Sequence, residues 1–253
     1  MAWTADHRRV LERDGFANAG RVFDDAELAT IGREYDRWVT PEAQLLGNER
    51  DGRFPYRAML TFRSPVLRAL LTHPALLAIA ADVLGPDVRF WWDQGIDKSP
   101  GAGSHIPWHQ DNGYERGRMP SYLTCWLALD ASSLENGGLE AIPGSHREGQ
   151  CTHAREGAHA VIAGADVDVA RAVPLDASAG DLLVFDSLLV HRTVGNRTRD
   201  RHRRAWVVQY CRGDQRNEIT GEQYDNRAWV LRGGEPVAVP WSERRFDLHA
   251  DRP

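Results

Sequence analysis

Residues 106–111 read IPWHQD, a short stretch in which one residue separates a histidine from an aspartate. In a β-strand, residues i and i+2 point to the same face, so an extended segment here projects His109 and Asp111 together. One imidazole and one carboxylate on a rigid strand provide two of the three ligands of a 2-His-1-carboxylate metal site. Such a site leaves coordination positions open for a chelating molecule and for oxygen.

The third ligand has to come from another strand, and His191 is the best candidate. It follows the apolar run LVFDSLLV at 183–190, about eighty residues after the first pair. Such a run places the imidazole beside a buried strand, where it needs a polar partner. A His-x-Asp pair alone, or a lone histidine after an apolar run, is more often an ordinary structural feature. Their order and spacing together, with an arginine-rich turn after them, indicate a metal site.

Short segments rich in Val, Leu, Trp and Phe surround these residues and alternate with Gly, Pro and Asn turns. This pattern predicts a β-sandwich or barrel. Residues 150–175 show little periodicity and are expected to form a long loop. The expected strands lie at 88–97, 105–112, 122–130, 138–142, 181–187, 190–194 and 203–212.

The first third of the chain is predicted to be helical. Residues 5–13 form a short helix that the Gly-Phe pair at 15–16 breaks, and Asp24 with Glu27 fits the capping box of a second helix. Residues 65–84 suit one or two more. Helices followed by strands are typical of an α+β fold in which the helices buttress one sheet. We expect one domain over 1–253, with a helical part at about 1–86, a β core at about 87–212 and an irregular tail at 213–253.

Composition narrows the classes of function. The net charge of −5 argues against a nucleic-acid-binding protein. Three cysteines without a CxxC pair do not form a disulfide framework. The N-terminus lacks the apolar region of a signal peptide, and no run of about 18 apolar residues predicts a membrane span. We therefore expect a cytoplasmic protein. The sequence does not indicate its oligomeric state.

An arginine on the strand that returns after His191 can reach the same cavity, and arginine binds carboxylates through bidentate, charge-assisted hydrogen bonds. Further motifs occur in a fixed order along the chain. The chain resembles the phytanoyl-CoA dioxygenase family of iron(II)/2-oxoglutarate oxygenases over about residues 90–210. The motifs that carry the resemblance are WHQD at 108–111, TCWLALD at 124–130, ENGGL at 135–139, IPGSH at 142–146, HxTxxNxT at 191–198 and RRA at 203–205.

The resemblance implies a double-stranded β-helix, a cupin-like jelly roll with the metal at its open end. It implies Fe(II), held by His109, Asp111 and His191, and the cosubstrates 2-oxoglutarate and O2. Decarboxylation of 2-oxoglutarate to succinate and carbon dioxide then drives oxidation, usually hydroxylation, of a small molecule. Related halogenases replace the carboxylate ligand with a small residue, so Asp111 favours oxygenation.

The resemblance also places the 2-oxoglutarate carboxylate on Arg203, with the Thr193 hydroxyl supporting it. The loop before Arg203 is one residue longer than usual, which leaves Arg204 as a rival. Strand parity favours Arg203, because it shares a face with Ala205 whereas Arg204 does not. Thr124, Trp126 and Gln94 are expected to line the cosubstrate pocket. For Thr124 and Trp126, a place in the ordinary core of the sheet is an equal alternative.

The substrate is less well specified. Loop 112–120, with Asn112 and Tyr114, is expected to overhang the metal, and residues 48–56 to form a lid. Lys98 is the only lysine in an arginine-rich chain, which indicates either a specific need or chance, and it is a candidate to bind a substrate anion. The arginine excess is typical of a GC-rich genome and consistent with bacterial secondary metabolism. The turns at 136–138 and 143–146 are interpreted as structural.

The sequence leaves the substrate and the position oxidised open, and it does not separate hydroxylation from desaturation, ring closure or epimerisation. Two other functions remain as alternatives. A metal-dependent cupin-like isomerase or lyase would keep the three ligands without needing Arg203 or Thr193. A non-catalytic binding protein of the same fold would tend to lose a ligand, and none is missing here.

Overall fold

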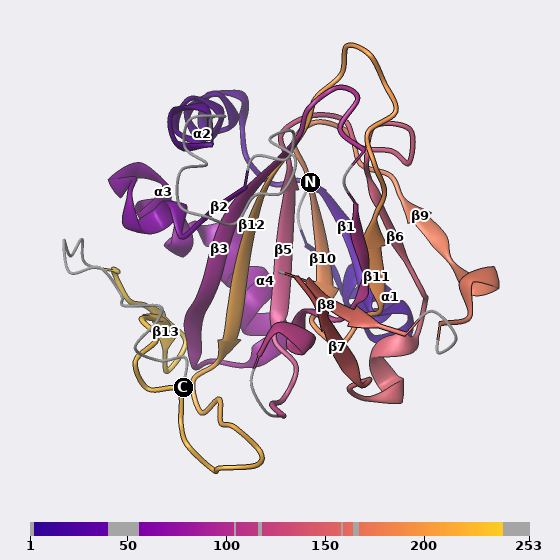
Figure 1. Cartoon of the computed structure of the whole chain (residues 1–253). Coiled ribbons are helices and arrows are strands. Elements are labelled where there is room, and N and C mark those ends of the chain that lie inside the picture. Colours follow the sequence, from indigo (N-terminus) through magenta and orange to yellow (C-terminus); the bar gives the residue numbers. More distant parts are fainter. Residues whose placement is uncertain are drawn as a thin grey trace.

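The computed structural model describes residues 3–39, 56–103, 105–115, 118–157, 159–163 and 167–239. Within these ranges two antiparallel sheets face each other, which confirms the predicted jelly roll (Figure 1). The large sheet runs β1 (Phe16–Arg21), β10 (Asp181–Asp186), β5 (Leu123–Ala128), β12 (Arg203–Arg212), β3 (Val88–Lys98), β13 (Trp229–Arg232) and β14 (Glu235–Pro236), with β2 (Tyr56–Ala58) also paired to β3. The small sheet runs β4 (Ile106–His109), β11 (His191–Thr193), β6 (Leu139–Ala141) and β9 (Val173–Leu175).

The helices cover the outer face of the large sheet, opposite the small sheet (Figure 1). The capping box of Asp24 and Glu27 is confirmed, and Gly15 ends the first helix with a φ of 86°. The helices are α1 (Ala5–Asp14), α2 (Asp25–Trp38), α3 (Pro65–Ala69) and α4 (Pro74–Leu84), with short 3-10 turns η2 (Leu60–Phe62), η3 (Leu70–Thr72), η4 (Asp111–Tyr114), η5 (Ser145–Glu148) and η7 (Val169–Arg171).

No single helix in the described ranges is long and apolar enough to cross a membrane. One bent pair, Pro65–Thr72 with Pro74–Leu84, meets the length and composition test only when its two halves are taken together.

The central strands are buried on both faces, and their side chains alternate between two cores. On β5, Leu123, Cys125 and Leu127 pack in the core beneath the helices, whereas Trp126 and Ala128 pack between the sheets. Strand β12 follows the same rule. Residues that face inward between the sheets therefore recur at every second position, and this interior contains the site described below.

Some of the expected elements were wrong. Residues 16–21 form β1 at the edge of the large sheet, paired with β10. Residues 150–175, expected to be a loop, form the hairpin β7 (His153–Glu156) and β8 (His159–Ile162), then η7 and β9. The tail expected from residue 213 contains β13, which pairs with β3. These strands are short, and several are polar, so their periodicity is too weak to be visible without their partners. The expected lid at 48–56 lies outside the described residues except for Tyr56.

Asp93 provides a test of the outer core through pH. Its fully buried carboxylate accepts hydrogen bonds from Thr61 and Trp206, yet burial raises the pKa from 3.8 to about 6. Between these values the folded protein holds a proton that the unfolded chain has released, so stability falls as pH rises. The Asp93 contribution to the free energy of unfolding should decrease by about 2 kcal/mol between pH 4 and pH 7.

Urea unfolding of wild type and Asp93→Asn at several pH values in this window measures that decrease. Because asparagine does not titrate, the stability of wild type relative to the variant should decline steadily. A difference that stays constant with pH would show that Asp93 does not titrate in this window.

Candidate metal centre and cosubstrate pocket

The three predicted ligands converge at one point between the sheets. Their donor atoms all lie within 4.8 Å of one another. The Nε2 atoms of His109 and His191 each lie 3.7 Å from Oδ1 of Asp111. The two histidines are direct partners across β4 and β11, and their ring centroids are 4.2 Å apart. Two nitrogens and one carboxylate oxygen in this arrangement fit the facial set that binds a non-haem iron.

The predicted strand ends earlier than expected, since β4 stops at His109 and Asp111 begins η4. Gln110 between them nevertheless keeps an extended backbone, with φ −113° and ψ 145°. The two ligands therefore still point the same way. The Gln110 side chain points away and donates to the carbonyls of Gly149 and Leu188, at 2.8 and 2.7 Å.

Backbone carbonyls orient both imidazoles. Nδ1 of His109 lies 2.8 Å from the Pro107 carbonyl, and Nδ1 of His191 lies 2.9 Å from the Leu189 carbonyl. A carbonyl only accepts, so each Nδ1 carries the proton and each Nε2 presents a lone pair. Burial, with a smaller effect of His191, lowers the pKa of His109 well below its usual value. The neutral ring is the form that a metal binds.

Asp111 is held by two side chains of the large sheet. Its Oδ2 accepts hydrogen bonds from Thr124 Oγ1 at 2.7 Å and Gln209 Nε2 at 2.9 Å, while Oδ1 faces the imidazoles. Thr124 was expected to line the cosubstrate pocket, which stays a prediction, and its hydroxyl also supports the carboxylate ligand. Gln209 was not identified from the sequence. Strand parity would have found it, because it shares the inner face of β12 with Arg203.

We expect Thr124→Val to weaken metal binding roughly 10- to 100-fold, because the valine cannot donate to the carboxylate ligand. Thr124→Ser is the matched control and should keep the wild-type affinity. An anaerobic competition between the protein and a chromogenic Fe(II) chelator measures both. Equal affinity in valine and serine variants would mean that this hydrogen bond does not orient Asp111.

Arg203 is fully buried at the start of β12 and faces the interior. Its Nε donates to the Gly137 carbonyl at 3.1 Å, and its guanidinium lies 5.5 Å from the Trp126 ring centroid. Within the described part of the chain, its two terminal nitrogens are buried without a hydrogen-bond partner. A buried cation with unpaired donors is costly, so these nitrogens fit a carboxylate that arrives with a ligand.

Arg204 faces the opposite way. Its guanidinium makes a two-point contact with Asp130, at 2.9 and 2.7 Å, and a further ion pair with Asp36 at 2.7 Å. These contacts hold the Arg204 guanidinium on the outer face of the sheet. The prediction from strand parity that Arg203 faces the interior is therefore confirmed, whereas the role of Arg203 toward 2-oxoglutarate stays a prediction.

The other pocket candidates lie on the same inner faces. Thr193 is buried on β11, and Trp126 is buried between the sheets. In the large sheet Val207 pairs with Gln94 on one side and Trp126 on the other, so Gln94 and Trp126 flank Val207 on the same face. Gln94 Oε1 accepts hydrogen bonds from Tyr56 and Trp92, both at 3.0 Å.

The substrate candidates take different positions. Tyr114 packs edge-on against His109, with ring centroids 5.4 Å apart. Asn112 is fully buried and donates to the Met119 carbonyl at 2.9 Å, so it shapes the loop. Lys98 is also fully buried and pairs with Arg203 across the strands. It is the last residue of β3, and its role toward a substrate anion stays a prediction.

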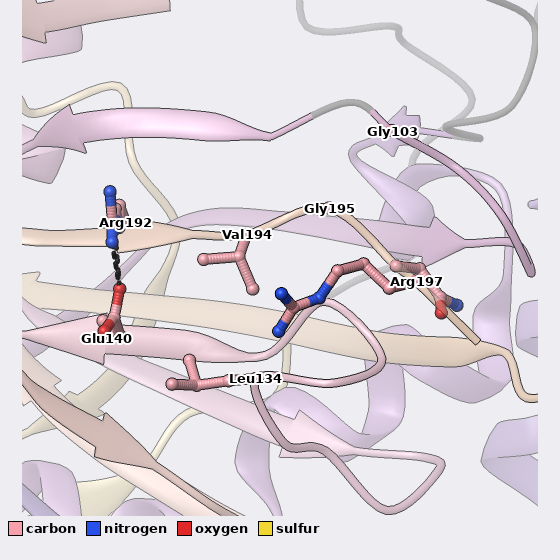
Figure 2. Close-up of a pocket in the computed structure, with 8 residues that line it drawn as sticks. Gly103, Leu134, Glu140, Arg192, Val194, Gly195 and Arg197 are labelled. Atoms are coloured by element: carbon pink, nitrogen blue, oxygen red, sulfur yellow. Dashed lines mark hydrogen bonds and ion pairs between the residues drawn. The ribbon is translucent and has the colours of Figure 1, made fainter.

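A separate cavity of about 450 Å³ lies beside the small sheet (Figure 2). There Arg192 forms an ion pair with Glu140 at 2.6 Å. Arg192 alternates with His191 and Thr193 on β11, so this cavity opens on the face away from the metal ligands. The cavity is lined by Gly103, Leu134, Glu140, Arg192, Val194, Gly195, Asn196 and Arg197.

Fold and site together define a non-haem iron enzyme of the 2-oxoglutarate-dependent dioxygenase class. The chain belongs to the phytanoyl-CoA dioxygenase (PhyH) family, which matches residues 11–205. Iron is its cofactor, and 2-oxoglutarate and oxygen are its cosubstrates.

Three relatives illustrate the likeness. Dioxygenase lolE1 of Epichloe uncinata is 28% identical over 231 residues, which covers 83% of this chain and 84% of lolE1. Ectoine dioxygenase of Bordetella parapertussis is 31% identical over 156 residues, 58% of this chain and 51% of that protein, so the match spans about half of its length. The crystal structure of EvdO2 from Micromonospora carbonacea var. aurantiaca, complexed with 2-oxoglutarate, has a TM-score of 0.72 at 25% identity and covers 95% of this chain and 97% of EvdO2.

Proposed function

We propose that His109, Asp111 and His191 bind Fe(II), that Arg203 and Thr193 bind the distal carboxylate of 2-oxoglutarate, and that the enzyme hydroxylates a small molecule. One observation carries this proposal. The buried Arg203 guanidinium keeps two unpaired terminal nitrogens in the same interior as the three converging ligands. A 2-oxo acid that also carries a distal carboxylate is the ligand that suits both ends of this interior.

When bound, the iron supplies oxygen activation coupled to decarboxylation of 2-oxoglutarate. Backbone and side-chain groups of the protein hold the ligands in position for it. The Pro107 and Leu189 carbonyls fix the imidazole tautomers, and Thr124 with Gln209 fixes the carboxylate. The retained carboxylate of Asp111 supports oxygenation over halogenation, because it occupies the place that a halide would need.

Our proposal for the substrate is a compact molecule with an apolar part. Partly exposed aromatic side chains support it: Tyr114 packs on His109, while Tyr56 and Trp92 both donate to Gln94 on the inner face of β3. The relatives include an ectoine dioxygenase, which is named for a small-molecule substrate. The arginine-rich composition with a single lysine is consistent with a GC-rich bacterial source and with tailoring in secondary metabolism.

The decisive experiment mixes the purified protein anaerobically with Fe(II) and 2-oxoglutarate and records the visible charge-transfer band of the chelated 2-oxo acid. We expect the band to appear, and succinate to form once oxygen and a substrate are added. Iron binding without a band would instead favour a non-oxidative cupin-like isomerase or lyase. Absence of iron binding would favour a binding protein.

A further inference from the structure

The single lysine of the chain joins the two sheets inside the cosubstrate pocket. Lys98 has no exposed surface and stands opposite Arg203 on the paired strands β3 and β12. Its Nζ donates to Thr193 Oγ1 at 2.7 Å and to the Val194 carbonyl, both at the end of β11 in the small sheet. The ammonium group is therefore next to both residues proposed to bind the distal carboxylate.

Lys98 determines which way the Thr193 hydroxyl points. Thr193 Oγ1 accepts one hydrogen bond from Lys98 Nζ at 2.7 Å and another from the Ile106 amide at 3.3 Å. Ammonium and amide groups only donate, and a hydroxyl has two acceptor positions and one proton. Both acceptor positions are thus in use, and the hydroxyl proton is directed to a third partner. Thr193 is prepared as a donor, which is what a carboxylate requires.

The turn at Gly137 fixes the two cations relative to each other. Its carbonyl accepts from Arg203 Nε at 3.1 Å, and a Cβ atom at this glycine would lie 2.6 Å from Lys98 Cδ. The glycine also has a φ of 94°, which side chains rarely allow. The turn was interpreted as structural from the sequence. It also forms a wall that leaves space for the lysine.

Electrostatics favour an anion here. Burial, and then the nearby Arg203, lower the pKa of Lys98 well below its usual value. Burial also lowers the pKa of Arg203 to about 10. Two buried cations oppose each other's charge, and an anion between or beside them relieves both costs.

We propose that Lys98 is a positioning residue of the cosubstrate site: it directs the Thr193 hydroxyl at the distal carboxylate of the 2-oxo acid and, beside Arg203, selects a dicarboxylate. This rests on the proposed function, and it goes further by assigning the selectivity for a dicarboxylate to a lysine–threonine pair in addition to the arginine. A 2-oxo acid that lacks the distal carboxylate gains nothing from Lys98.

The test compares 2-oxoglutarate with 2-oxopentanoate, which has the same chelating end and the same chain length but no distal carboxylate. Both are titrated anaerobically into the Fe(II)-loaded protein, and the charge-transfer band reports binding. Lys98→Met should raise the dissociation constant of 2-oxoglutarate roughly 10- to 100-fold, as expected for a lost charge-assisted contact. The dissociation constant of 2-oxopentanoate should stay unchanged.

Thr193 provides the matched pair. Thr193→Val should lose selectivity, Thr193→Ser should keep it, and the Lys98→Met/Thr193→Val double variant should lose less than the two single losses combined. If Lys98→Met does not fold, as judged by thermal unfolding, Lys98→Gln replaces it and should still lose at least half of the selectivity on a logarithmic scale.

The possible outcomes distinguish a failure of the proposed carboxylate site from a failure of the proposed role of Lys98. Wild type that binds both 2-oxo acids equally would contradict the proposed carboxylate site itself. Wild type that prefers 2-oxoglutarate, with the same preference in the folded Lys98 variant, would overturn the role of Lys98 alone. If the Lys98 variant lost affinity for both 2-oxo acids by the same factor, the role of Lys98 would also be overturned. A lysine that only stabilises the pocket would have that effect.

Discussion

Alanine in place of His191 is expected to abolish the charge-transfer band and turnover, and to weaken Fe(II) binding by more than the 10- to 100-fold typical of outer-shell partners. Among the residues that the structure describes, His191 is one of three donors that converge at the centre, and its Nε2 lies 3.7 Å from Asp111 Oδ1. Without it, the site keeps one nitrogen and one carboxylate oxygen, which is too few to hold iron in a facial arrangement. Asp111→Ala should behave in the same way.

His146 provides the control. It lies in the turn after IPGS, and its Nε2 is 3.2 Å from the Glu12 carbonyl, outside the cluster of ligands. His146→Ala should therefore bind iron and show the band like wild type. Anaerobic iron titration followed by 2-oxoglutarate measures both variants in one experiment. Equal losses in the two variants would mean that the ligand assignment is wrong.

Removal of the Arg203 side chain should have the second-largest effect. Truncating one partner of a buried charge pair costs about 2–5 kcal/mol, which is roughly a 30-fold or greater rise in the 2-oxoglutarate dissociation constant. The buried Thr193 and Lys98 keep the pocket polar, so high concentrations of 2-oxoglutarate should restore part of the turnover in Arg203→Ala.

Arg204→Ala is the matched comparison, because it removes the adjacent guanidinium of the same strand. Arg204 makes its contacts with Asp130 and Asp36 on the other face of the sheet. Its loss should leave the 2-oxoglutarate requirement unchanged and reduce stability only slightly, as is typical of partly exposed ion pairs. The reverse result, a defect in Arg204→Ala and wild-type behaviour in Arg203→Ala, would show that parity does not identify the cosubstrate anchor.

Part of this site follows from the sequence because strand parity is a local property. The period of two predicts that His109 and Asp111 point together and that Arg203 and Arg204 point apart, and the structure agrees on both. The agreement survives an error in the strand itself, because the extended backbone of Gln110 preserves the orientation after β4 has ended. Central strands such as β3, β5 and β12 were predicted for a related reason, since burial on both faces makes them rich in large apolar side chains.

Edge strands are different. β1 buries few large side chains, and β7 is largely exposed, so neither shows the periodicity of a strand. β1 is a strand because β10 pairs with it, and β7 because β8 does. Their hydrogen bonds come from residues elsewhere in the chain, and a local pattern does not contain that information.

By itself, the sequence determined the central strands, the three converging donors and the opposite directions of Arg203 and Arg204. These depend on residue type and on a backbone period that neighbouring residues set. Only the tertiary structure decided that Gln209 holds Asp111, that Lys98 holds Thr193 and that Gly137 leaves space for the Lys98 side chain. Each of these contacts joins residues far apart in the chain, and their register depends on how both sheets and the helices pack as a whole.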